Sequence, residues 1–294
     1  SIGLLLLPQL SSHPFPPLWQ VHGSVRTINR GNPAGHEVLV DTWPDFKAVL
    51  TRPRPEVVID HLDSYTNTYV AYYRDVGAYR DLLGSAITRN QSFRIHGNIG
   101  PTTPGKLSMY LLFGSNPRIP PKSIISPSPV ALCSPRLDPA VRLSSLDVSH
   151  LDLVNEMWAI GGNKHSRRYL ESLIRRFPNF CLLDTSDNPV SWGLSDMFGA
   201  IICTFTLPQH RGHGYNGALN ILVAKHLHAQ GYPCYGHVAP ENFPIQRQQE
   251  RQGCQRQPGL CYIMIHNAVL DTAPMSAPIQ APGTSHPGDP AARG

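Results

Sequence analysis

The chain has 294 residues, 41% hydrophobic and 15% charged, which suffices for one large domain or two of ordinary size. So few charged residues exclude a charge-rich disordered chain and a coiled coil. The net charge of +5 comes from scattered basic residues, so a nucleic-acid partner is not indicated, although a small anionic ligand is compatible with it. No stretch approaches the ~20 apolar residues of a membrane span.

The first predicted elements are short and interrupted by proline. Residues 1–17 combine a leucine run with four prolines, and we expect them to be irregular. Apolar residues alternate over 21–28, a Gly-Asn-Pro turn follows at 31–33, and a second apolar run covers 37–40. This pattern predicts a hairpin or two neighbouring strands.

The next segments lead into a proline-rich stretch. Residues 47–51 form a short apolar run, 66–73 predict a strand or a buried helix, and a short helix is expected to end at 80–83. Residues 97–139 hold nine prolines and few charges, which indicates a linker or a poorly ordered region. The apolar island at 109–113 inside it is too short to build a domain.

The second half is more regular. Its periodicity and turn residues predict, in order, helices at 151–158 and 166–177, a hairpin of strands at 181–183 and 190–194, a strand at 200–207, a helix at 218–228 and a strand at 235–238. A glycine-containing loop lies between the third of these strands and the helix that follows it. Anions bind at such junctions of strand and helix.

The cysteines indicate no disulfide framework or metal site. All six lack CxxC spacing and metal spacing with histidine, and several lie in apolar runs: Cys133, Cys181, Cys203, Cys234, Cys254 and Cys261. We interpret them as reduced, buried thiols in a protein of a reducing compartment. No metal is expected.

The loop carries the most informative motif. It comprises Gln209, His210, Arg211, Gly212, His213 and Gly214. The two glycines remove the Cβ atoms that would block a pyrophosphate, and the positive end of the following helix faces the anion. The loop resembles the Q/R-x-x-G-x-G/A pattern of the acetyltransferase-type (GNAT) fold. A simple helix entrance is the alternative, with His210 and His213 as solvated loop residues rather than bases.

Several segments together resemble the glycine N-acyltransferase family, over residues 21–94 and 143–242. They are the loop and residues 28–33, 41–46, 65–69, 153–155, 158, 161–163, 189–192 and 206–208. The resemblance implies a mixed α/β, GNAT-like acyltransferase fold with an N-terminal α/β half and a C-terminal CoA-binding half. We expect an N-terminal region at 18–138 that ends in the linker 97–138, a C-terminal region at 139–268 with the family's C-terminal segment from about 181, and a disordered tail at 269–294.

The resemblance also implies a reaction. Acyl-CoA would be the co-substrate, and the amine of glycine or a related amino acid would attack its thioester without a metal. The backbone N–H of Leu207 would stabilise the oxyanion, and the family's general-base glutamate falls at the position of Ala200. The alternative is therefore a catalytically impaired CoA-binding relic. The family implies a mitochondrial location, with the cytoplasm as the alternative because no targeting signal is readable; the oligomeric state is open.

Three segments depart from the family pattern: the first 20 residues, residues 97–139 and everything after about 244. Residues 243–258 form a Gln/Arg-rich run where the fold requires a helix and a closing strand, and residues 271–294 are rich in proline, alanine and glycine. We therefore expect an incomplete fold, and a chain that does not fold stably is a third possibility.

Overall fold

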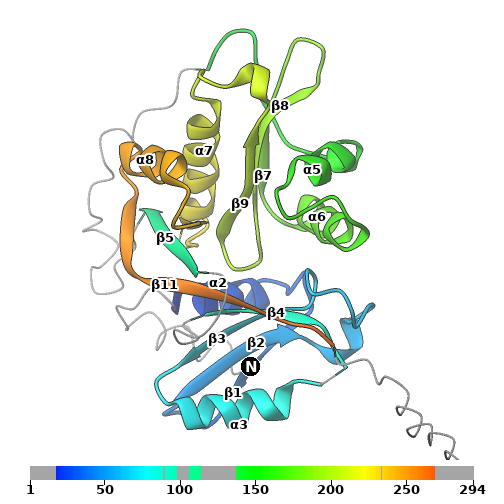
Figure 1. Ribbon diagram of the computed structural model, residues 1–294, viewed down its shortest axis with the longest axis vertical. Helices are drawn as coiled ribbons and strands as arrows, with labels where there is room; N and C mark the ends of the chain where they lie inside the picture. Colours follow the sequence, from blue (N-terminus) through cyan, green and yellow to red (C-terminus); the bar gives the residue numbers. More distant parts are fainter. Residues whose placement is uncertain (1–17, 89, 98–105, 114–136, 233, 269–294) are drawn as a thin grey trace, which may run out of the picture.

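One mixed sheet runs through the molecule. The computed structural model describes residues 18–88, 90–97, 106–113, 137–232 and 234–268. Their eleven strands lie in the order β1-β2-β3-β4-β11-β5-β10-β9-β8-β7-β6. Helices cover both faces, so the predicted mixed α/β class is confirmed (Figure 1).

The N-terminal half supplies one end of the sheet. Its elements are α2 (Leu18–Asn29), β1 (His36–Val40), β2 (Ala48–Pro53), η1 (Pro55–Val57), β3 (Thr68–Tyr73), α3 (Val76–Ala86), β4 (Phe93–Gly97) and β5 (Lys106–Phe113). Helix α3 lies on the outer face of strands β1 to β4, and α2 lies on the face toward the C-terminal half (Figure 1). The predicted strand at 37–40 and the helix ending near 83 are confirmed, and residues 66–73 form a strand.

The predicted strand at 21–28 is wrong, because these residues form helix α2. Val21 and Val25 are one helical turn apart, are fully buried, and pack in one core with Val70 and Phe198. Apolar residues four apart satisfy the spacing of a helix as well as the alternation of a strand. Strand β1 instead pairs antiparallel with β2.

The C-terminal half is built around a second group of strands. Its elements are β6 (Arg142–Ser144), η2 (Val148–His150), α5 (Leu151–Met157), α6 (Lys164–Arg176), β7 (Asn179–Leu183), β8 (Pro189–Ser195), β9 (Ala200–Thr206), η3 (Pro208–His210), α7 (Tyr215–Ala229), β10 (Cys234–Val238), α8 (Phe243–Arg251) and β11 (Gln255–His266). Helices α5 and α6 cover one face of β7 to β9, and α7 covers the other (Figure 1). All the elements predicted between 151 and 238 are confirmed.

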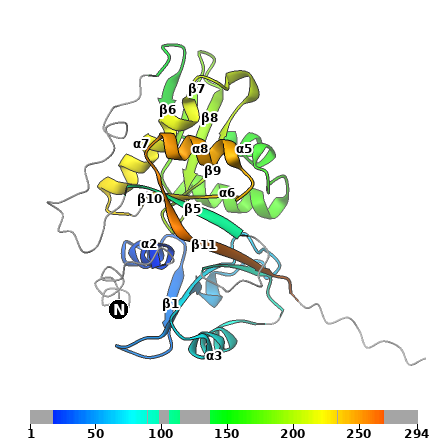
Figure 2. The same cartoon turned by 60° about the vertical axis from the view of Figure 1, so that its left-hand side comes forward.

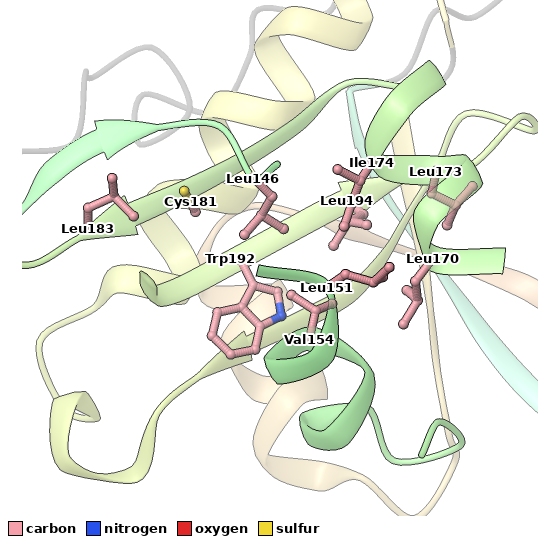
Figure 3. Close-up of a cluster of buried hydrophobic side chains, with 10 residues drawn as sticks. All are labelled: Leu146, Leu151, Val154, Leu170, Leu173, Ile174, Cys181, Leu183, Trp192 and Leu194. Carbon is pink, nitrogen blue, oxygen red and sulfur yellow. The ribbon is translucent and has the colours of Figure 1, made fainter. Parts of the chain in front are cut away.

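Trp192 anchors the core beneath α5 and α6. Its side chain is fully buried and packs among Val154 of α5, Leu170 of α6 and neighbouring strand residues (Figure 3). Asn163 caps the N-terminus of α6: its Oδ1 accepts hydrogen bonds from the N–H groups of His165 and Ser166 at 3.0 and 2.9 Å.

Residues 243–258 do form a helix and a strand, so the prediction of an incomplete fold is wrong there. Helix α8 begins after Asn242, whose side chain accepts a hydrogen bond from Ile245 N–H, and a proline lies in its first turn. Gln246 is buried and donates to the carbonyls of Ala239 and Pro240 at 3.0 and 2.7 Å. The composition of residues 243–251 is polar and therefore did not predict a helix. The buried glutamine is accommodated in this helix because it is hydrogen-bonded to the backbone.

The predicted linker contains a strand. Residues 106–113 form β5, which lies between β10 and β11. Strand β11 is long enough to pair with β5 and then with β4, and it joins the two halves (Figure 2). Residues 98–105 and 114–136 of that stretch, the first 17 residues and the predicted tail at 269–294 lie outside the described residues. The boundary at 138/139 stays a prediction.

Candidate active site between strands β9 and β10

Strands β9 and β10 run parallel but pair only at their beginnings. Tyr235 lies opposite Ala200 and Gly236 opposite Ile201, and pairing ends there although both strands continue. Strand β9 bulges against β8, and Cys203 at the bulge has a φ of 51°. Bulges bend a strand away from its regular course. The two strands therefore separate toward their carboxyl ends.

A narrow groove of about 50 Å³ lies at this separation, between β9, β10, α7 and α8. Thr204 of β9, His237 of β10 and Asn220 of α7 line it. The Asn220 amide donates to Asn216 Oδ1 at 3.1 Å, but its own Oδ1 is buried and has no partner among the described residues. An amide N–H of a chain lying in the groove would satisfy this orphaned acceptor.

The glycine loop lies between the end of β9 and the start of α7. Gly212 and Gly214 have φ values of 88° and 76°, and an added Cβ would meet no atom within 4 Å at either position. Gly214 is the N-cap of the fifteen-residue helix α7, so the unsatisfied N–H groups of the first helical turn face open space. The residues present fit the phosphate groups of CoA.

The other loop residues border this open space. Arg211 donates from Nε to Thr206 O at 3.3 Å and lies over the Phe205 ring. His213 stacks on the Tyr215 ring, and its Nδ1 lies 3.1 Å from the carbonyl oxygen of Arg211. Gln209 is exposed and His210 is half-buried. The structure brings the six predicted residues together at the N-terminus of α7, and their role in binding stays a prediction.

Leu207 does not present its N–H to the groove. That N–H donates to Val190 O at 2.9 Å, so it is engaged with strand β8. Hydrogen-bonded and non-hydrogen-bonded pairs of residues alternate between antiparallel strands. The next pair, Ser191 with Thr206, is therefore not hydrogen-bonded through the backbone, and the Thr206 N–H points to the edge of β9 that faces away from β8. The Thr206 N–H, and not that of Leu207, therefore points toward the side on which β10 lies.

Ala200 lies opposite Tyr235, one of the residues that line the groove. It is fully buried and packs with Tyr235 and Trp19. The preceding carboxylate, Asp196, holds the β8–β9 turn, because its Oδ1 accepts hydrogen bonds from Phe198 N–H and Ala200 N–H, both at 2.9 Å. Burial raises the pKa of Asp196 to about 7. Asp196 is therefore a structural residue of this turn.

The raised pKa of Asp196 predicts that stability falls as the pH rises from about 4 to about 7. The folded state retains the Asp196 proton in this range, whereas in the unfolded state the carboxyl has its ordinary pKa of 3.8 and has lost the proton. The free energy of unfolding should decline by at most about 1.4 kcal/mol per pH unit from this group. Chemical denaturation across this range should show a shallower decline for Asp196→Asn, which keeps an oxygen acceptor for the two N–H groups. An identical decline in both proteins would contradict the prediction.

The five described cysteines form no disulfides, and Cys133 lies outside the described residues. Burial raises the pKa of Cys203 to about 12, so this thiol next to the groove is not a nucleophile. Within the described ranges, no group of three or more His, Cys, Asp or Glu side chains could hold a metal ion. No helix among the described residues has the length and hydrophobicity to cross a membrane.

The fold of this chain occurs in solved structures. A tandem GNAT protein from the clavulanic acid biosynthesis pathway superposes with a TM-score of 0.50, at 12% identity, over 92% of this chain and 95% of that one. A Drosophila protein solved by X-ray crystallography gives a TM-score of 0.63 at 13% identity, over 89% of this chain and 94% of that one. The fold is that of the GNAT acyltransferases.

The sequence defines the family more narrowly. The model of aralkyl acyl-CoA:amino acid N-acyltransferases matches residues 3–100 and 121–178, and the model of that family's C-terminal region matches residues 180–258. Bovine glycine N-acyltransferase is 35% identical over 248 residues, which cover 78% of this chain and 84% of the relative. The chain belongs to the aralkyl acyl-CoA:amino acid N-acyltransferase family.

These matches correct two expectations. The family pattern was expected to be absent from the first 20 residues and from 97–139, but the N-terminal model includes residues 3–20 and all but 101–120 of the second stretch. It was also expected to end at about 244, and the C-terminal model extends to 258. The low-complexity composition of these segments concealed their relationship to the family.

Proposed function

We propose that this protein transfers the acyl group of an acyl-CoA to the amine of glycine or a related amino acid. The observation that carries the proposal is the groove between β9 and β10, which Asn220 of α7 lines, together with the glycine loop at the N-terminus of the same helix. Family membership supports the acyl-CoA and amino acid substrates, and the bovine relative is named a glycine N-acyltransferase.

Each part of the groove has a role in binding the co-substrate. The first N–H groups of α7 and the charge of Arg211 hold the phosphates of CoA. Asn220 Oδ1 accepts from an amide N–H of the pantetheine arm, which lies along the unpaired edge of β9. The Thr206 N–H on this edge donates to the thioester oxygen and stabilises the negative charge that develops there during the reaction.

The reaction needs no covalent enzyme intermediate. The neutral amine attacks the thioester carbon, the C–N bond forms, and the C–S bond of the tetrahedral intermediate breaks. The nitrogen loses one proton as the amide forms, and the CoA thiolate gains one as it leaves. Only the unprotonated amine is nucleophilic, so a group that accepts the ammonium proton accelerates the step.

The alternative function, a CoA-binding relic, is favoured by one observation, namely that Ala200 has no basic side chain. Ala200→Glu should raise kcat by about 100-fold, because general-base assistance contributes roughly 10² to 10⁴ in rate. Ala200→Gln is the matched control, since it has a similar size and cannot accept the proton, and both should be compared at equal folded fraction because each buries a polar group. A glutamate variant no faster than the glutamine variant would show that the absent carboxylate does not limit turnover.

Calorimetric titration with an acyl-CoA, beside a glycine-dependent thiol-release assay, tests the proposed function. Binding together with thiol release would support an N-acyltransferase. Binding without thiol release would support the relic, and absence of binding would contradict both.

A further inference from the structure

Two buried polar side chains on β4 lie where the N-terminal half meets the C-terminal half. Arg94 and His96 are two residues apart on this strand, so they point to the same face of the sheet, and they are 8% and 9% exposed. The alternate residues Phe93 and Ile95 point to the opposite face and pack in the core beneath α3. The face that carries Arg94 and His96 is covered by the C-terminal half.

The His96 ring has no hydrogen-bond partner among the described residues. Both of its ring nitrogens are buried and unsatisfied. The ring lies 5.7 Å from the Phe198 ring and 6.4 Å from the His237 ring, measured between centroids. His237 also lines the groove between β9 and β10, and its Nε2 lies 3.0 Å from the Gln20 amide nitrogen. Buried polar atoms are almost always hydrogen-bonded, so the nitrogens of His96 indicate a missing partner.

Arg94 is a buried cation without a carboxylate partner within 4 Å among the described residues. Its Nε donates to Ser64 O at 2.8 Å, and its guanidinium lies over the Tyr65 ring at 4.3 Å. The Asp63 carboxylate lies 3.5 Å from Arg168, and its electrostatic interaction with Arg94 is over a longer distance. Buried charges are normally paired, and the planar guanidinium matches a carboxylate.

A cavity of about 750 Å³ lies next to this pair, although neither residue lines it. Three of its lining residues are neighbours of the pair: Thr68 lies opposite Arg94 across strands β3 and β4, Tyr169 lies beneath the Arg94 guanidinium at 5.9 Å, and Phe198 contacts His96. The acyl-CoA groove approaches from the other side at His237. Arg94 and His96 therefore lie between residues that line this cavity and His237, which lines the groove.

We propose that Arg94 binds the carboxylate of the amino acid acceptor and that His96 accepts a hydrogen bond from its amine. This inference rests on the proposed function and assigns the acceptor site of the same reaction. A carboxylate supplies the missing counter-charge, and an amine next to the carboxylate supplies a donor to the His96 ring, which otherwise has none among the described residues. The acceptor is thus an α-amino acid rather than a simple amine.

The surroundings keep the two imidazoles neutral. Burial lowers the pKa of His96 well below its usual 6.5, with further contributions from the nearby His237 and Arg94, and burial lowers the pKa of His237 to about 4. Neutral rings accept hydrogen bonds and do not repel an incoming ammonium group.

Replacing Arg94 should change acceptor selectivity and not acyl-CoA binding. Charge-assisted hydrogen bonds to a carboxylate are strong, so Arg94→Gln should raise the KM for glycine by about 10- to 100-fold. Glycinamide lacks the carboxylate, and its kcat/KM should change less than threefold, as should the KM for acyl-CoA. Arg94→Lys should recover part of the preference for glycine over glycinamide, because it retains the charge but not the planar fork.

Arg52→Gln is the matched control. Arg52 is a partly buried arginine of the same half, bonded to Glu37 at 2.9 Å and to the Ala86 carbonyl of α3, away from the seam between the halves. It should leave the preference for glycine unchanged. If Arg94→Gln lowered kcat/KM by the same factor with glycine and with glycinamide, the inference would be overturned, because a purely structural residue would have that effect.

Calorimetric titration of glycine into the protein saturated with CoA separates this inference from the proposed function. Glycine binding that is weakened by Arg94→Gln and by His96→Leu, in a protein without thiol release, would support the acceptor site and contradict the proposed function. Thiol release from glycine and glycinamide with equal kcat/KM in the unsubstituted protein would support the function and overturn the acceptor site.

Discussion

Gly23→Ala is expected to lower the free energy of unfolding by about 3 kcal/mol or more, although alanine is the better helix former. Gly23 lies in the middle of α2, where a Cβ would overlap the carbonyl oxygen of Phe198. The β8–β9 turn cannot move aside easily, because that oxygen accepts from Tyr235 Oη at 2.9 Å and the preceding carbonyl, Met197 O, accepts from Thr27 Oγ1 at 2.8 Å. The substitution should therefore separate α2 from the turn.

Gly84→Ala is the control for this prediction. Gly84 also lies within a helix, α3, and an added Cβ there meets no atom within 4 Å. Gly84→Ala should raise the free energy of unfolding by about 0.5 to 1 kcal/mol, because alanine favours a helix more than glycine does. Denaturant titration of the two variants should give shifts of opposite sign. A shift of similar size and sign in both would contradict the close approach of α2 to the turn.

Gly212→Glu should raise the Kd for acyl-CoA by at least about 100-fold. Gly212 has a φ of 88°, which an L-residue adopts only with strain, and its missing side chain leaves open the space in front of α7. A glutamate would add strain there and also a negative charge where the phosphates of CoA would lie. Calorimetric titration with CoA measures the change directly.

Gly31→Glu is the matched control for the loop. Gly31 has a φ of 97° in the turn after α2, and an added Cβ there also meets no atom within 4 Å. Both variants introduce the same residue at a strained but open position, so their stability costs should be similar. Only Gly212→Glu should weaken CoA binding. Equal weakening by both would mean that the loop does not hold the phosphates.

The fold could be predicted from the sequence where the pattern was strong and local. Helices at 151–157 and 164–176 and the strands that follow have apolar residues at a single clear period, bounded by turn residues. Helix α2 was misassigned because Val21 and Val25 satisfy two periods, and its tertiary contacts decide between them. Strands β5 and β11 gave weak signals because their pairing partners are distant in the chain.

The residues of the candidate site could likewise be predicted from the sequence only in part. The glycine loop was found because six adjacent residues carry its pattern, and Ala200 was found through the family resemblance. Thr206 could not be distinguished from Leu207, since hydrogen-bond alternation depends on the register with β8. No sequence pattern indicates Arg94 and His96. Both side chains become buried, and the His96 nitrogens become unsatisfied, only when the two halves pack together.

The exchange of strands between the halves affects how the protein is made. Strand β4 is completed on one side by β11, which comes from the end of the described chain, and β5 is enclosed between β10 and β11. While a ribosome is still synthesising residues 255–266, the nascent N-terminal half presents an open strand edge that can pair with other chains. A chain that terminates early should therefore aggregate rather than persist as a folded half, and refolding after dilution should be slow because these pairings close long loops.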